Sequence, residues 1–357
     1  MKTANQFDLF ARPAASLAVP PAVEQALQQG AALCISISGG KDSQALLAEL
    51  APWFRQRGYG GQLFAIHADL GRAEWGETPA FVELLCQRAS VPLIVVQRTK
   101  GDLVQRIQER MDTVAGTDTP FWPSAASRYC TSHLKGNPID TALRDPLHFW
   151  PSSSQRYCTS DLKRGPIDSA LRDFEVIISA EGVRADESKA RAKKPAVEIR
   201  TSITAQALRD LDCEDALAQR KPGQRVAFNW RPLLNYNTEE VWQACGATSR
   251  ELAFRQQLYA EGHHADALAG WVGHPAYVYG NERLSCALCV LGSKKDLING
   301  ANHNPETYGL YLELEVIGNS TFKHKESLFD LPVTGRAAEV KAEWLARKNE
   351  PVLHGTH

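Results

Sequence analysis

Six consecutive residues near the amino terminus have the chemical groups of a phosphate-binding site: Ser38, Gly39, Gly40, Lys41, Asp42 and Ser43. The two glycines allow backbone conformations that bring amide groups close to an anion. The serine hydroxyls add hydrogen-bond donors, and Lys41 adds a cation. This set of groups indicates a site for the phosphates of a nucleotide. The alternative is an incidental Gly-Gly turn in which Asp42 and Ser43 cap a helix.

The elements predicted on either side place this segment at a junction where anions bind. Residues 31–38 (AALCISIS) form a short apolar run, which predicts a strand that ends at the glycines. From Asp42 onward, Leu46, Leu47 and Leu50 fall on one face of a helix. The unpaired N–H groups at the start of that helix, and the positive end of its dipole, favour a bound anion.

Three further apolar runs predict strands of the same sheet. They cover residues 62–68, 91–97 and 174–180, and a helix is predicted over 78–88. Apolar strands that alternate with helices predict an α/β fold, a parallel sheet with helices on both faces. Ligands of such sheets bind beyond the carboxyl ends of the strands, so the residues that follow the strands are candidate site residues.

Polar residues follow two of these strands. Asp69 comes after the second strand and could hold a ribose hydroxyl or Mg²⁺, or it could be a turn aspartate bonded to nearby backbone. The residues after the fourth strand are Gly182, Arg184, Glu187, Ser188 and Arg191. Arg184 or Arg191 could bind phosphate oxygens as a fork, with Glu187 orienting one guanidinium. The spacing of Glu187 and Arg191 also suits an ion pair on a helix surface.

Four of the eight cysteines have a pattern that could bind a metal. Cys286 and Cys289 have the C-x-x-C spacing of zinc sites, iron–sulfur clusters and redox dithiols. Cys130 and Cys158 each lie in an R-Y-C-T sequence. Three alternatives remain open for these side chains: an iron–sulfur cluster, a structural zinc, or reduced thiols without metal.

A tandem repeat contains two of these cysteines. Residues 121–148 and 149–176 are identical at 18 of 28 positions. We interpret the second copy as the structural one, because it runs directly into the strand at 174–180. The first copy is then a duplication carried as a surface loop, since long insertions in exposed loops cost little stability.

The charge balance limits how the chain could bind nucleic acid. Lys and Arg number 40 and Asp and Glu 41, so the net charge is −1. A protein that holds nucleic acid mainly through phosphates is usually basic, so any such contact needs a local patch. The candidate is the run Lys189, Arg191, Lys193 and Lys194, with an ordinary solvated surface as the alternative.

The first twenty residues lack the apolar core of a signal peptide, and no apolar run reaches the roughly 20 residues that span a bilayer. We therefore expect a cytoplasmic protein without membrane contact, whose cysteines are reduced thiols, metal ligands or catalytic groups and do not form a disulfide framework. Three segments are predicted: an extension over 1–30, a nucleotide-binding domain with the repeat over 31–245, and a smaller region over 246–357 that contains the C-x-x-C pair.

The sequence SGGKDS resembles the PP-loop of the ATP pyrophosphatase superfamily, and its spacing differs from that of a Walker A loop. Five later segments resemble, in order, the motifs of phosphoadenosine phosphosulfate (PAPS) reductase-like proteins. They are HADLGRAEWGETPAFVE, RYCTSDLKRGPI, EGVRADESKARA, WRPLLNYNTEEVW and CALCVLGSKKDL. The resemblance extends over residues 30–330 and identifies the chain as a member of this broad group.

The resemblance implies an adenine nucleotide alpha-hydrolase-like fold and cleavage of ATP to AMP and pyrophosphate. It implies ATP and Mg²⁺ as cofactors, and Lys41, Asp42 and Arg184 as catalytic residues. A [4Fe–4S] cluster on Cys130, Cys158, Cys286 and Cys289 is a further implication. The partners it implies are a nucleic-acid acceptor and a sulfur-donor protein.

One departure separates this chain from true PAPS reductases. Those enzymes typically have a degenerate loop and attack the sulfonucleotide with a cysteine near the carboxyl terminus. This chain has an intact SGGKDS and no cysteine after Cys289. A thiol nucleophile cannot be replaced by another side chain without a change of chemistry. We therefore expect adenylation of an acceptor for sulfur transfer, as in tRNA and DNA sulfurtransferases. The alternatives are a sulfonucleotide reductase and a non-catalytic nucleotide-binding module.

Overall fold

The computed structural model describes residues 16–114, 150–151, 156–323 and 326–348. The chain forms two compact units that interleave along the sequence. Unit 1 comprises residues 1–67, 79–96 and 167–278, and unit 2 comprises 68–78, 97–166 and 279–357. The division into the consecutive segments 1–30, 31–245 and 246–357 stays a prediction. In the described residues, no helix combines the length and the apolar character that crossing a membrane requires.

A six-stranded sheet in the order β3–β2–β1–β4–β6–β5 forms the centre of unit 1. Its strands are β1 Ala32–Ser36, β2 Leu63–Asp69, β3 Leu93–Gln97, β4 Val176–Ala180, β5 Val197–Ile199 and β6 Val226–Trp230. β1 runs parallel to β2 and β4, and β4 runs parallel to β6, whereas β5 is antiparallel to β6. The predicted α/β class is confirmed, and β5 and β6 are strands that the sequence did not predict.

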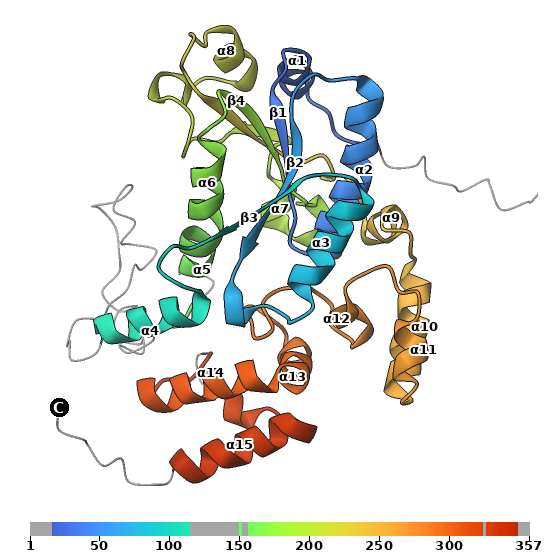
Figure 1. Cartoon of the computed structure of the whole chain (residues 1–357), viewed down its shortest axis with the longest axis vertical. Helices are drawn as coiled ribbons and strands as arrows, with labels where there is room; N and C mark the ends of the chain where they lie inside the picture. Colours follow the sequence, from blue (N-terminus) through green and yellow to red (C-terminus); the bar gives the residue numbers. More distant parts are fainter. Residues whose placement is uncertain (1–15, 115–149, 152–155, 324–325, 349–357) are drawn as a thin grey trace, which may run out of the picture. The chain divides into compact units, whose positions relative to one another are not determined.

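Helices cover both faces of this sheet. The helices of unit 1 are α1 Pro21–Gln28, α2 Lys41–Arg57, α3 Thr78–Arg88, α6 Gly165–Leu171, α7 Lys189–Ala192, α8 Cys213–Ala218, α9 Thr238–Ala244, α10 Ser249–Ala260, α11 His264–Leu268 and α12 Pro275–Val278, with 3₁₀ turns η5 Ala185–Glu187 and η6 Gln206–Leu208. Figure 1 shows α2 and α3 on one side of the strands and α6 on the other. The chain moves outward from β1 to β2 and β3 and then returns past β1 to β4, in the opposite direction across the sheet. Right-handed crossovers therefore place the helices of the two parts on opposite faces.

Unit 2 is mainly helical around its own core. Its elements are α4 Leu103–Val114, α5 Tyr157–Thr159, α13 Lys294–His303, α14 Pro305–Gly318 and α15 Gly335–Lys348, with short turns η2 Gly71–Ala73, η4 Ser160–Arg164 and η7 Leu328–Asp330. Trp150, from the second repeat copy, is fully buried in this core. Its ring stacks on Tyr311 with centroids 5.4 Å apart and meets Phe322 edge-on at 4.9 Å. Its indole N–H donates to the carbonyl oxygen of Ser320 at 3.2 Å.

These contacts predict that the same Trp→Ala substitution lowers the stability of the protein much more in the second repeat copy than in the first. Trp150→Ala should lower the free energy of unfolding by about 3–5 kcal/mol, because it leaves a cavity in the core of unit 2. The matched change in the first copy, Trp122→Ala, should cost less than about 1 kcal/mol if only the second copy forms the core. Urea denaturation of both variants measures the difference. Equal losses would contradict our interpretation of the second copy as the structural one.

Candidate functional site

The 38–43 loop connects the end of β1 to the start of α2, as the sequence predicts. Gly39 has φ of +75°, a left-handed conformation that residues with a side chain rarely adopt, and Gly40 precedes the first turn of α2. The hydroxyl of Ser43 accepts from the amide of Ser38 at 3.1 Å and donates to the carbonyl of Gly40 at 2.9 Å. The loop is therefore a tight bend at the carboxyl edge of the sheet, with the positive end of the α2 dipole beside it.

Three charged side chains form a row next to this bend. Lys41 Nζ lies 3.1 Å from Asp42 Oδ2, and Arg184 Nε donates to Asp42 Oδ1 at 2.6 Å. Lys41 and Arg184 are 8% and 3% exposed, so the carboxylate lies between two cations that are almost out of solvent. Hydrogen bonds between charged groups of this kind are the stronger ones in proteins.

The guanidinium of Arg184 is largely occupied by protein groups. Nη1 lies 2.5 Å from a carboxylate oxygen of Asp186 and 3.4 Å from the carbonyl oxygen of Tyr236, and Nη2 donates to the hydroxyl of Thr238 at 3.3 Å. With the bond to Asp42, four of its five N–H groups have partners, and one is left for a ligand. In this arrangement Arg184 fixes Asp42, and the binding of phosphate oxygens by Arg184 stays a prediction.

The other candidates after β4 bind to one another. Glu187 accepts from the backbone amide of Arg184 at 3.3 Å and pairs with the guanidinium of Arg191. Ser188 caps α7 by accepting from the amide of Arg191 at 3.2 Å. Gly182 passes so near α2 that an added Cβ would lie 3.0 Å from the carbonyl oxygen of Asp42. The structure thus brings these residues into one turn beside Asp42, and their contact with a nucleotide stays a prediction.

Two residues without a predicted role contact the 38–43 loop. The backbone N–H of Lys41 donates to the hydroxyl of Tyr277 at 3.0 Å, and Lys41 Nζ lies 5.9 Å from the centre of that ring. The thiol of Cys245 donates to the carbonyl of Lys41 at 3.3 Å. These partners are 236 and 204 residues from Lys41 along the chain, so no local sequence pattern indicates them.

Asp69 is the last residue of β2, and it groups with unit 2. Its carboxylate accepts from the backbone N–H of Gly71 at 2.7 Å. A bond to the amide two residues ahead is the geometry of an aspartate turn. The contact matches the turn alternative, and a role for Asp69 in binding ribose or Mg²⁺ stays a prediction.

Three of the four candidate metal ligands lie in unit 2. Cys158, Cys286 and Cys289 are partly exposed, and the first two pack against the core of the unit. Burial is the main cause that raises the pKa of Cys286 to about 12; the charge of Lys163 opposes it, and the thiols of Cys289 and Cys158 add to it, so the three thiols are close enough to influence one another. As placed, however, no three His, Cys, Asp or Glu side chains of the described residues form a group that could hold a metal ion. Cys130 lies outside the described residues, and the metal site stays a prediction.

The surroundings of Cys245 predict a slow reaction with alkylating agents. Burial, followed by the charge of Asp42, raises its pKa from 9.0 to about 12. Only the thiolate reacts, so iodoacetamide at about pH 8 should modify Cys245 much more slowly in native protein than after denaturation in urea. Mass spectrometry of the alkylated peptide measures the rate. Equal rates in native and denatured protein would contradict the buried position and the raised pKa of Cys245.

The same pKa makes stability depend on pH. Because the raised pKa of Cys245 favours the protonated thiol in the folded state, its contribution to stability is present below pH 9 and falls as the pH rises toward 12.

Among solved structures, the chain is similar to the U34-tRNA thiolase NcsA from Methanococcus maripaludis, which was solved with its [4Fe-4S] cluster. The two chains are 12% identical, and the match covers 92% of this chain and 74% of NcsA with a TM-score of 0.35. A TM-score of this size does not allow the two sites to be compared residue by residue. A comparison with curated proteins finds no match to the sequence.

The family assignment rests on the sequence of the central part of the chain, which includes most of unit 1. Residues 32–265 match the phosphoadenosine phosphosulfate reductase domain family. The match includes the 38–43 loop, Arg184 and Cys158, and it ends before Cys286. It covers well over half of the sequence, and the chain therefore belongs to the phosphoadenosine phosphosulfate reductase domain family.

Proposed function

We propose that this protein binds ATP at the 38–43 loop and cleaves it to AMP and pyrophosphate, adenylating an acceptor that then receives sulfur. The observation that carries the proposal is the row Lys41–Asp42–Arg184 beside a glycine bend at the start of α2. It combines amide donors, a helix dipole and a nearly buried cation at one place, which suits a triphosphate.

Each group in the row has a separate task in this reaction. An acceptor oxygen bonds to the α phosphorus while the bond to the bridging oxygen breaks, and pyrophosphate leaves with the electron pair. The amides of the loop and the ammonium of Lys41 stabilise the charge that develops on the leaving pyrophosphate. Asp42 orients Lys41 through their 3.1 Å contact, and Arg184 is the positioning residue that holds Asp42. Mg²⁺, when bound, adds Lewis-acid stabilisation of phosphate oxygens, and Asp42 offers the carboxylate ligand that this ion prefers.

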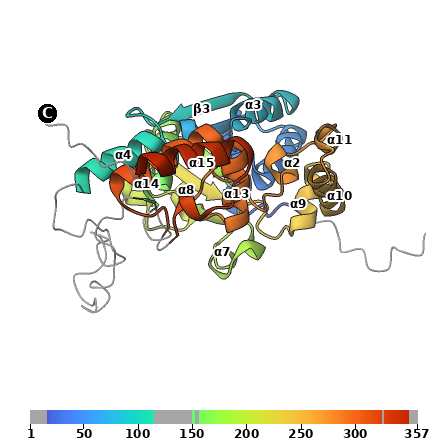
Figure 2. The same ribbon diagram turned by 90° about the horizontal axis from the view of Figure 1, so that it is seen from below.

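A nucleic acid is the acceptor we propose, with a protein as the sulfur donor. Lys189, Lys193 and Lys194 are exposed in and after α7, in the same unit as the loop. Figure 2 shows α7 and α3 at opposite sides of unit 1, with α7 projecting outward. A projecting basic turn close in sequence to Arg184 can attract a polyanion toward the site.

Reduction of a sulfonucleotide is the second candidate, and the family match favours it. A PAPS reductase would release sulfite with a thiol reductant and would not release pyrophosphate from ATP. The intact SGGKDS loop weighs against this candidate. The two activities are separated by assaying pyrophosphate and sulfite in the same preparations.

Substitutions in the row should abolish release of pyrophosphate. Lys41→Ala and Asp42→Ala should each lower kcat/KM for ATP by about 10²–10³, because the first removes the cation aimed at the leaving group and the second removes the carboxylate that orients this cation. Arg184→Lys keeps the charge but not the fork, so it should reduce kcat more than it changes KM. The matched control is Arg57→Ala at the other end of α2, where the side chain is exposed and pairs with Glu24. Calorimetry that detects no ATP binding by the wild-type protein would end the proposal.

The thiols of unit 2 predict an iron–sulfur cluster that can be tested without an activity assay. Protein purified under anaerobic conditions should contain iron and acid-labile sulfide and absorb visible light, and Cys286→Ala should lose both. Cys86→Ala is the control, because Cys86 is buried in α3 of unit 1. Zinc in place of iron would support the structural-zinc alternative, and protein without either metal would remove the cluster from the proposal.

A further inference from the structure

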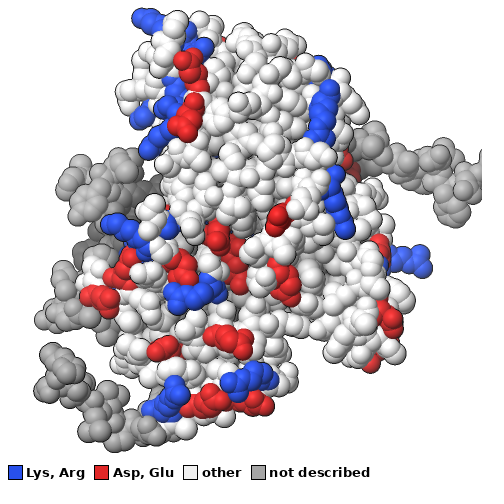
Figure 3. All heavy atoms as spheres, viewed as in Figure 1, with Lys and Arg blue, Asp and Glu red and all other residues white. Residues whose placement is uncertain are grey.

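A hollow of about 410 Å³ in unit 1 has three arginines and no acidic residue in its lining. The arginines are Arg172, Arg209 and Arg225. Ser202 and Gln224 add a hydroxyl and an amide group to the same lining. On the face shown in Figure 3, basic and acidic side chains are interspersed, as expected for a chain with a net charge of −1. A concave site with cations alone is a different environment, and it favours an anion.

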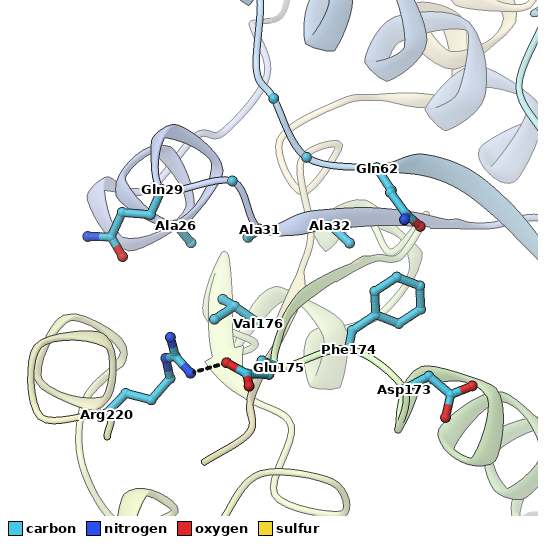
Figure 4. Close-up of a pocket in the computed structure, with 13 residues that line it drawn as sticks. Ala26, Gln29, Ala31, Ala32, Gln62, Asp173, Phe174, Glu175, Val176 and Arg220 are labelled. Atoms are coloured by element: carbon cyan, nitrogen blue, oxygen red, sulfur yellow. Dashed lines mark hydrogen bonds and ion pairs between the residues drawn. The ribbon is translucent and has the colours of Figure 1, made fainter. Parts of the chain in front are cut away.

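The neighbouring hollow in unit 1 shows the contrast. It measures about 530 Å³ and has both signs of charge in its lining, namely Asp173, Glu175 and Arg220. Arg220 and Glu175 pair at 2.9 Å (Figure 4), so their charges offset each other. Asp173 follows Arg172 directly in the chain, but it lines this other hollow and not the hollow of the three arginines. The residues that line the hollow of the three arginines therefore include no acidic residue.

Neutral backbone groups hold two of the three guanidiniums in place. Arg209 Nε donates to the carbonyl of Thr204 at 2.8 Å, and Arg225 Nε donates to the carbonyl of Phe174 at 3.0 Å. A second N–H of Arg225 donates to the carbonyl of Arg172. Carbonyl acceptors fix the orientation of a guanidinium without cancelling its charge, and they leave other N–H groups for a ligand. An oriented guanidinium fork matches the oxygens of a phosphate.

This hollow lies at the opposite edge of the sheet from the 38–43 loop. Arg172 and Arg225 come shortly before β4 and β6, at the amino ends of these parallel strands, whereas the loop follows β1 at the carboxyl edge. β4 has five residues, which at about 3.3 Å per residue separates the two edges by about 16 Å. One phosphate cannot contact both places, so the arginines belong to a separate site.

We propose that the hollow of Arg172, Arg209 and Arg225 binds a phosphate group that is not part of the nucleotide at the 38–43 loop. The phosphate comes from the backbone of a nucleic acid or from a free phosphate compound, and the same fork contacts recognise either source. The site does not depend on ATP cleavage. Loss of ATP cleavage at the 38–43 loop should leave it intact.

Binding of two probes tests the site, with variants that change charge inside and outside the hollow. The probes are inorganic phosphate, followed by ³¹P NMR, and a short single-stranded RNA, followed by fluorescence anisotropy. Arg172→Glu changes an exposed side chain, and Arg209→Gln removes a charge but keeps an amide. Each should raise the Kd of a bound probe about tenfold, since a charged hydrogen bond is lost. The matched control is Lys221→Glu, an exposed cation near the hollow but outside its lining.

Each outcome decides the proposal. Weaker binding of both probes in the hollow variants, with a salt dependence for RNA reduced by about 0.7 per lost phosphate contact, supports a nucleic-acid backbone as the source. Weaker binding of phosphate alone supports a free phosphate compound. The proposal is overturned if neither probe binds wild-type protein, if the hollow variants bind as well as wild type, or if Lys221→Glu weakens binding equally. Lys41→Ala can weaken phosphate binding only at the 38–43 loop, so probe binding that remains in Lys41→Ala and is lost in the hollow variants separates this result from a failure of the proposed ATP cleavage.

Discussion

Asp42 carries its charge between Lys41 and Arg184, two cations with almost no access to solvent. Removing one member of a buried ion pair commonly costs about 3–5 kcal/mol, because the remaining charge stays desolvated. The first turn of α2, the turn after β4 and the start of α9 must therefore keep their relative positions. The geometry of the 38–43 loop follows from this requirement as much as from its two glycines.

The loop was predictable because its signals are local. A β-rich run, two glycines and an amphipathic helix follow one another within about twenty residues, and each signal has its own physical cause. Arg184 was found by the rule that ligands bind beyond the carboxyl ends of parallel strands. Its bond to Asp42 was not predicted, because spacing along the chain does not show which of several partners a guanidinium selects.

Other contacts had no sequence signal at all. Tyr277 and Cys245 reach Lys41 across more than two hundred residues, and both look like ordinary core residues in the sequence. β5 and β6 were missed for a different reason. β5 has only three residues, and the run before Trp230 contains Asn229, which interrupts the apolar pattern of a buried strand. Asn229 accepts from the buried Arg200 at 3.0 Å, so its polarity is satisfied by a partner that the sequence does not reveal.

The interleaved order of the two units has a consequence for synthesis of the protein. The 38–43 loop is translated early, but Tyr277, whose hydroxyl accepts a hydrogen bond from the amide of Lys41, is made far later. Residues 97–166 of unit 2 emerge from the ribosome before β4 and β6 are available to complete the sheet. A nascent chain must therefore keep the β4-facing edge of β1 uncovered until about half of the chain has been made, and a chaperone that binds exposed strands would have its longest opportunity during this interval.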